Sequence, residues 1–159
     1  ATNVNRLIGK KFGFITLFLD FLKTFCPCLI MHKYFGTEVG VVSGFLTILG
    51  HIYPIWLKFK GGKGVASYMG FMLATSWPLF IVLIITWLVI VKIFKYSAVA
   101  AIISILINLI TFKIILFTQF NYNILLWIKG DPIEFQFILF ISIIILIKHY
   151  TNVINIFKK

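Results

Sequence analysis

Residues 57–67 read LKFKGGKGVAS and interrupt two long apolar segments. The stretch contains three lysines, at positions 58, 60 and 63, and three glycines, at positions 61, 62 and 64. Glycine permits positive φ and a close approach of the backbone to a ligand, and lysine supplies positive charge. Consecutive backbone amides ahead of a helix suit an anion such as phosphate. The stretch predicts either a phosphate-binding loop or a basic turn between two membrane helices. It is not a nucleotide P-loop, because Gly64 stands where that motif needs Ser or Thr after the lysine.

The composition indicates a membrane protein. Of the 159 residues, 61% are hydrophobic, and the mean hydropathy is +1.06. Such values are typical of a polytopic membrane protein and not of a soluble domain. The net charge of +11 does not indicate nucleic-acid binding, because the lysines stand at the ends of apolar segments.

The apolar segments predict an all-α polytopic membrane bundle of about six hydrophobic helices within a single domain, residues 1–159. Residues 65–91 carry no charge, a length that is too great for one span and too small for two. Pro78 disfavours helix at Trp77, which divides this segment into a short helix and a longer one. The expected helices cover residues 12–31, 39–57, 65–75, 79–91, 96–119 and 135–147. The helix at 65–75 is too short to cross a bilayer and is expected to be a partial span.

Asp20, Lys23 and His51 are among the ionisable residues that fall within the expected spans. Asp20 and Lys23 are spaced i, i+3, so they share a helix face and are expected to pair. The pair is interpreted either as part of a functional site or as a structural ion pair. His51, close to Pro54 at a span end, is expected to have a structural hydrogen-bonding role.

The distribution of charge predicts which polar segments share a face of the membrane. The positive-inside rule places most of the 15 basic residues on the cytoplasmic side: Arg6, Lys10, Lys11, Lys58, Lys60, Lys63, Lys92, Lys95, Lys148, Lys158 and Lys159. The N-terminal strip, residues 57–67 and the C-terminal tail are then expected to meet on that side.

Together these three segments predict an anion-binding site. Its candidate residues are Asn3, Arg6, Lys60, Gly61, Gly62, Lys63, Gly64, His149 and Asn152. Arginine offers a fork of donors to phosphate, lysine offers point charges, and asparagine can hold hydroxyl groups. No carboxylate lies in the three segments, which argues against a metal site, and no cofactor is expected. No serine or cysteine there stands with a base, which argues against covalent catalysis.

The chain resembles the bacterial membrane glycerol-3-phosphate acyltransferases that use acyl phosphate as donor. Three patterns match in order: ATNVNR at 1–6, followed by DFLK at 20–23; GHIYPIWLKFKGGKGVAS at 50–67; and KHYTNVINI at 148–156. The family's usual first membrane helix and its Ser/Gly/Asn-rich run are absent, so the chain is expected to be N-terminally incomplete, with seven helices in the full-length family. Ser67 and Lys148 replace the usual threonine and arginine.

The resemblance implies an enzyme that transfers an acyl group from fatty acyl phosphate to the 1-hydroxyl of glycerol 3-phosphate, giving lysophosphatidic acid and phosphate, the first step of phospholipid synthesis. The partners implied are these two substrates and the lipid bilayer, without nucleic acid. The expected location is the bacterial plasma membrane, with the active face cytoplasmic.

The resemblance also implies roles for single residues. Lys63 and His149 are the candidate catalytic residues, with His149 as a general base or a positioning group. Asn3, Arg6, Lys60, Gly61, Gly62, Gly64 and Asn152 are the candidate substrate-binding residues. The acyltransferase signature of histidine, four residues and aspartate is absent after His32, His51 and His149.

Two alternatives stay open at the level of sequence. One is a small membrane anion transporter or channel subunit, in which Asp20, Lys23 and the lysines of 57–67 line a pathway. The other is an inactive remnant of the acyltransferase.

Overall fold

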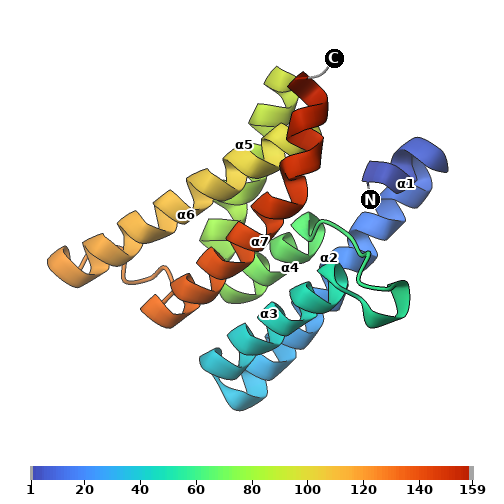
Figure 1. Cartoon of the computed structure of the whole chain (residues 1–159). Coiled ribbons are helices and arrows are strands. Elements are labelled where there is room, and N and C mark those ends of the chain that lie inside the picture. The colour runs from blue at the N-terminus through green and yellow to red at the C-terminus, as the bar shows by residue number, and fades with distance from the viewer. Residues whose placement is uncertain (1, 158–159) are drawn as a thin grey trace. The chain divides into compact units, whose positions relative to one another are not determined.

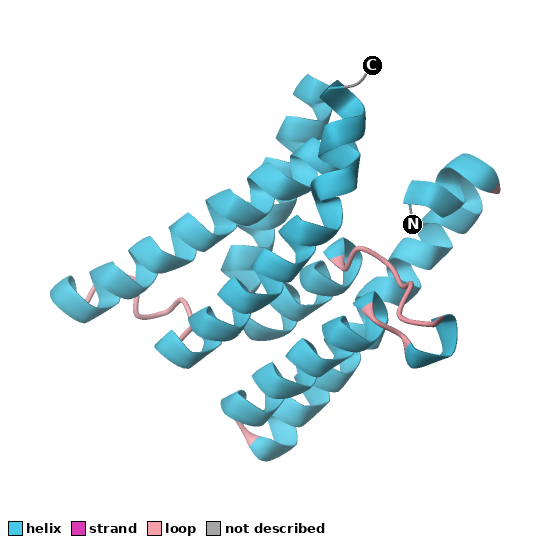
Figure 2. Ribbon diagram, in the orientation of Figure 1, coloured by secondary structure: helices cyan, strands magenta, loops and turns pink. Residues whose placement is uncertain are grey.

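The computed structural model describes the backbone of residues 2–157, and the side chains of all of these except residues 2, 3, 6, 151, 153 and 155–157. Every regular element in the described residues is a helix (Figure 1, Figure 2). The elements are α1 (Thr2–Leu7), α2 (Lys10–Phe35), α3 (Thr37–Ile52), the 3-10 turn η1 (Ile55–Leu57), α4 (Val65–Thr75), α5 (Trp77–Phe94), α6 (Ser97–Tyr122) and α7 (Pro132–Phe157). Within this part of the chain, five helices are long and apolar enough to cross a membrane, and α4 is a shorter apolar helix. The predicted all-α bundle of about six hydrophobic helices is confirmed.

The chain divides into two compact units, Ala1–Ala74 and Thr75–Lys159. The first unit contains α1, α2, α3 and α4 up to Ala74, and the second contains α5, α6 and α7. The organisation of residues 1–159 as one acyltransferase domain stays a prediction.

In the first unit, α2 and α3 form a helical hairpin that turns at one glycine. Gly36 has a φ of 92°, a left-handed conformation that favours glycine. Close packing continues beyond the turn, because a Cβ atom on Gly40 would lie 2.6 Å from the Cβ atom of His32. The expected end of the first helix at residue 31 and the expected start of the second at residue 39 are therefore wrong, since helix runs through Phe35 and resumes at Thr37.

Helix α4 begins and ends at the predicted residues and packs on α2 and α3. Its 11 residues rise about 16 Å, roughly half the hydrocarbon thickness of a bilayer. Tyr68 and Phe71 are fully buried. Gly70 lies against the carbonyl oxygen of Phe21 in α2, and Gly44 in α3 lies against the Phe71 ring. Small residues thus let a short helix sit close to its two longer neighbours.

In the second unit, α6 packs against both α5 and α7. Small residues near the start of α6 allow close packing, and Ala100, Ala101 and Ser104 are buried there. The amide Nδ2 of Asn108 in α6 donates to the carbonyl oxygen of Leu79 in α5 at 2.7 Å. This buried bond ties the two helices together at a polar point within apolar surroundings.

The polar ends of the chain are helical as well. The strip at 1–11 contains α1, and α1 lies against α2, because a Cβ atom on Gly13 would come 2.6 Å from that of Asn5. The polar tail continues α7 to Phe157. Neither glycine nor proline interrupts residues 148–157, so polarity alone does not end the helix.

Candidate functional site

The glycine–lysine loop, residues 58–64, leads from η1 into the first turn of α4 (Figure 1). Lys58 and Phe59 have left-handed backbone conformations, with φ of 51° and 62°, so the chain reverses direction at this point. Gly64 ends the loop with a φ of 84°. Its carbonyl oxygen accepts a hydrogen bond from Tyr68 N at 2.7 Å, the first bond of α4. The loop is therefore continuous with a helix N-terminus.

Two lysines of the loop stand just ahead of that helix. Lys60 is exposed and Lys63 is half-buried. The first N–H groups of an α-helix have no partners within the helix, and the helix dipole makes its N-terminus positive. This end of α4 combines lysine charge with backbone dipole, which favours an anion.

The three glycines of the loop are required for two different reasons. Gly64 has positive φ, as predicted, but Gly61 and Gly62 do not, so that expectation is wrong for them. A Cβ atom on Gly61 would collide with the carbonyl oxygen of His51 and would lie 2.5 Å from Cδ of Pro54. A Cβ atom on Gly62 would collide with the imidazole ring of His51 at Nε2. Close packing against the end of α3, and not left-handed backbone, requires glycine at these two positions.

The backbone of the same two glycines is bonded to α3. Gly61 N donates to the carbonyl oxygen of Ile52 at 3.3 Å, and Gly62 N donates to that of His51 at 3.1 Å. These amides serve to fix the loop. An anion here would be met by the lysine side chains and by the first turn of α4.

The side chains of Asp20, Lys23 and His51 contact one another next to the loop. Lys23 Nζ donates to Asp20 Oδ1 at 2.7 Å, which confirms the predicted i, i+3 pair. Lys23 Nζ also contacts His51 Nδ1, and His51 Nδ1 lies 3.4 Å from Asp20 Oδ1. The predicted hydrogen-bonding role of His51 is confirmed. The backbone of α2 also meets α4 here, because Ser67 Oγ donates to the carbonyl oxygen of Asp20 at 3.0 Å.

The second unit places His149 and Asn152 on α7. They are spaced i, i+3 on one helix and so lie on the same side of it. His149 is buried, and its Nδ1–H donates to the carbonyl oxygen of Ile145 at 2.8 Å. That bond fixes the ring and assigns the proton to Nδ1. Asn152 is half-buried.

The remaining candidates lie on α1. The helix contains Asn3 and Arg6, whose side chains lie outside the described residues. Lys60, Gly61, Gly62, Lys63 and Gly64 belong to the first unit, and His149 and Asn152 belong to the second. The meeting of the three segments at one site stays a prediction.

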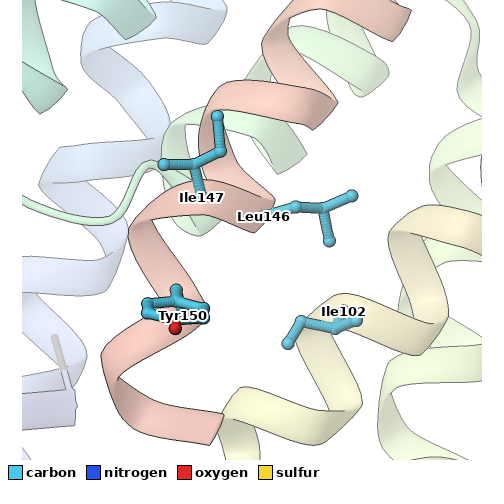
Figure 3. A pocket seen from close by; sticks show the side chains of 4 residues that line it. All are labelled: Ile102, Leu146, Ile147 and Tyr150. Carbon is cyan, nitrogen blue, oxygen red and sulfur yellow. The ribbon is translucent and has the colours of Figure 1, made fainter. Parts of the chain in front are cut away.

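An apolar hollow opens between α6 and α7, beside His149 in the sequence. It is lined by Ile102, Leu146, Ile147 and Tyr150 (Figure 3). Ile102 belongs to α6, and the other three residues belong to α7. The surface of the hollow is almost wholly hydrocarbon, which suits an alkyl chain.

Sequence reasoning missed two features, one in each unit. It paired Asp20 with Lys23 but did not join His51 to them, although His51 stands a few residues before the glycines in GHIYP. It also missed the apolar hollow, because isoleucine and leucine are so frequent in the chain that none of them stands out.

Comparison with known proteins gives consistent results. Residues 1–159 match the family described as glycerol-3-phosphate acyltransferase. The chain is 36% identical to a glycerol-3-phosphate acyltransferase of Bartonella henselae, over 96% of this chain and 68% of the relative. It is also 36% identical to one of Aquifex aeolicus, over 96% of this chain and 74% of the relative. A solved structure of PlsY, an integral membrane glycerol 3-phosphate acyltransferase in its glycerol 3-phosphate form, matches with a TM-score of 0.85 and 31% identity, over 99% of this chain and 73% of that chain.

Proposed function

Because the chain belongs to the glycerol-3-phosphate acyltransferase family, we propose that it acylates the 1-hydroxyl of glycerol 3-phosphate with a fatty acyl phosphate as donor. The chain is an acyltransferase and a multi-pass membrane protein. The products are lysophosphatidic acid, a phospholipid precursor, and inorganic phosphate. The observation that carries the proposal is the glycine–lysine loop at the start of α4, in a chain that matches the family over residues 1–159.

The reaction needs little covalent chemistry from the protein. The hydroxyl oxygen of glycerol 3-phosphate bonds to the acyl carbon, and the bond from that carbon to the phosphate oxygen breaks. The hydroxyl proton passes to the departing phosphate or to His149. An acyl phosphate is a mixed anhydride with a good leaving group, so holding the reactants in place and neutralising charge supply most of the catalysis.

The glycine–lysine loop is the proposed phosphate-binding element. Lys63 is the proposed catalytic residue and Lys60 supports it, since both are carried to the N-terminus of α4. Gly61 and Gly62 keep the loop against α3, and Gly64 turns the chain into α4. Lysine and helix N–H groups together suit a dianionic phosphate.

With its phosphate in the loop, glycerol 3-phosphate is proposed to be held as well by side chains of the other two segments. Asn3 and Arg6 are assigned to glycerol 3-phosphate by the family motif at 1–6. His149 and Asn152 share one side of α7, which allows both to contact one small polyol. His149 is the proposed general base, with Nδ1–H bonded to Ile145 and the base position at Nε2.

The hollow between α6 and α7 is the proposed seat of the acyl chain. Tyr150 lines it and directly follows the proposed base, His149, in the sequence of α7. The rest of the lining is aliphatic (Figure 3).

The active face is proposed to be cytoplasmic in a bacterial plasma membrane. Lys58, Lys60 and Lys63 lie in the loop, and Lys92 and Lys95 lie at the end of α5. Positive charge in short membrane loops favours the cytoplasmic side. Glycerol 3-phosphate is water-soluble and would reach this face directly.

The test uses purified protein in phospholipid vesicles with an acyl phosphate and glycerol 3-phosphate. The proposal predicts lysophosphatidic acid and phosphate in equal amounts, with both dependent on glycerol 3-phosphate. Transport of an anion across the vesicle without product would favour the transporter alternative. Absence of both product and transport in folded protein would favour the inactive remnant.

A further inference from the structure

The joined side chains of Asp20, Lys23 and His51 lie outside the proposed catalytic set. Lys23 Nζ is 2.7 Å from Asp20 Oδ1 and also contacts His51 Nδ1. An ammonium group has only donors, so His51 accepts at Nδ1, and its proton lies on Nε2. The imidazole is thus neutral, and Lys23 and Asp20 fix the orientation of its ring.

The same histidine contacts the glycine–lysine loop. Its carbonyl oxygen accepts from Gly62 N at 3.1 Å, and the next carbonyl, of Ile52, accepts from Gly61 N at 3.3 Å. Its ring occupies the space that a side chain at position 62 would need. His51 therefore contacts the loop with both its backbone and its ring.

A further bond joins the other end of the loop to the same region. Ser67 in the first turn of α4 donates to the carbonyl oxygen of Asp20 at 3.0 Å. Asp20 thus contacts Lys23 through its carboxylate and α4 through its backbone. The segment that carries Lys63 lies between two points of attachment, His51 before it and Asp20 after it.

We propose that Asp20, Lys23 and His51 form a positioning network that holds the glycine–lysine loop in its phosphate-binding conformation. The network sets the affinity for glycerol 3-phosphate and takes no part in the acyl-transfer step. This inference rests on the proposed function, because it assumes that the loop binds the phosphate of the acceptor.

The contacts of the network indicate a role in positioning. His51 contacts the loop at Gly62, and Asp20 accepts from Ser67 in the first turn of α4. Small displacements of a binding loop have large effects on function.

The first experiment compares kinetic constants in vesicles for His51→Ala, Lys23→Met and Lys33→Met. The first two variants are expected to raise the KM for glycerol 3-phosphate about 10-fold or more, with kcat and the KM for acyl phosphate nearly unchanged. Lys33→Met is the matched control, since Lys33 is an exposed lysine of α2 that lies near the Tyr34 ring and away from the loop in sequence. It should keep wild-type constants.

A wild-type KM for glycerol 3-phosphate in either His51→Ala or Lys23→Met would overturn the network. So would a loss confined to kcat, because that would place these residues in the transfer step. Lys63→Ala is measured in the same assay, because it tests the phosphate-binding role of the loop separately from the positioning role of the network. Full activity in Lys63→Ala refutes the phosphate-binding loop itself, whereas an inactive Lys63→Ala with an unaffected His51→Ala refutes the network alone.

The second experiment tests the contact between His51 and Gly62 directly. Gly62→Ala alone is expected to lose activity, because the new methyl group collides with the His51 ring. In the double variant with His51→Ala that ring is gone, so the double variant should be at least as active as Gly62→Ala. Losses that multiply independently would contradict the proposed contact. If His51→Ala alone accumulates poorly in membranes, the comparison of Gly62→Ala with the double variant still tests the contact.

Discussion

The two described parts of the candidate site are built in different ways. In the first unit, the glycine–lysine loop has no regular structure of its own and is held by backbone bonds to Ile52 and His51 and by glycines without room for a methyl group. In the second unit, His149 and Asn152 stand on the continuous helix α7. A loop fixed by close contacts depends on its backbone, whereas a helix presents side chains on a backbone that supports itself. Substitutions that add atoms to the loop should therefore lower activity, whereas in α7 only substitutions that remove a functional group should do so.

The largest effect is expected where the loop supplies charge. Lys63→Ala should reduce transfer about 100-fold or more, because a charge-assisted contact to the phosphate of glycerol 3-phosphate is lost. The measurement is phosphate release by protein in vesicles, with the amount of folded protein matched. Lys58→Ala is the control, since Lys58 is an exposed lysine of the same loop outside the proposed contacts. Equal losses in both variants would mean that only the total charge of the loop matters.

An added methyl group tests the close packing of the loop. Gly61→Ala should lower activity about 10-fold to 100-fold, because its Cβ atom meets the backbone carbonyl of His51, which cannot move aside as a side chain would. Gly50→Ala in α3 is the matched control, because a Cβ atom there meets nothing within 4 Å. It should keep activity and stabilise the helix by roughly 1 kcal/mol. Thermal unfolding and activity are measured on both, and a harmless Gly61→Ala would contradict the packing argument.

A lost functional group tests the helix side of the comparison. If His149 is the general base, the rate of the wild-type enzyme should rise with pH through an ionisation near neutral pH, since only the neutral imidazole accepts a proton. His149→Gln should remove that step and lower the rate about 100-fold or more. The pH dependence of kcat/KM for glycerol 3-phosphate measures this. The same pH dependence in His149→Gln would leave His149 only a positioning role.

The smallest effect is expected from loss of the hydrogen bond that links α4 to α2. Ser67→Ala removes the bond from Ser67 Oγ to the Asp20 carbonyl and should lower the free energy of unfolding by about 1 kcal/mol, with a few-fold rise in the KM for glycerol 3-phosphate. Ser67→Thr keeps the hydroxyl and should behave as wild type. Denaturation and kinetics on the two variants check this, and indistinguishable variants would remove this bond from the account.

Much of the fold could be predicted from the sequence because membrane spans are long and uniform. The charge-free segment and Pro78 were enough to place α4 at Val65–Thr75. The i, i+3 spacing was enough to pair Asp20 with Lys23. Both inferences depend only on residues that are near one another in the chain.

The predictions that were wrong depended on contacts between distant residues. Glycine at 61 and 62 suggested positive φ, but the true reason is the His51 ring and carbonyl, which reach the loop only through the tertiary fold. Their amides suggested an open anion nest, but they are bonded to α3.

The central claim is tested most directly by following the oxygen that bridges the acyl carbon and phosphorus in the donor. An acyl phosphate labelled with heavy oxygen at that position is given to the purified enzyme with glycerol 3-phosphate. All of the label is expected to leave in inorganic phosphate, in equal amount to unlabelled lysophosphatidic acid, and Lys63→Ala is expected to form both products at a rate reduced about 100-fold or more. Release of labelled phosphate without lysophosphatidic acid, or unchanged turnover in Lys63→Ala, would contradict the central claim.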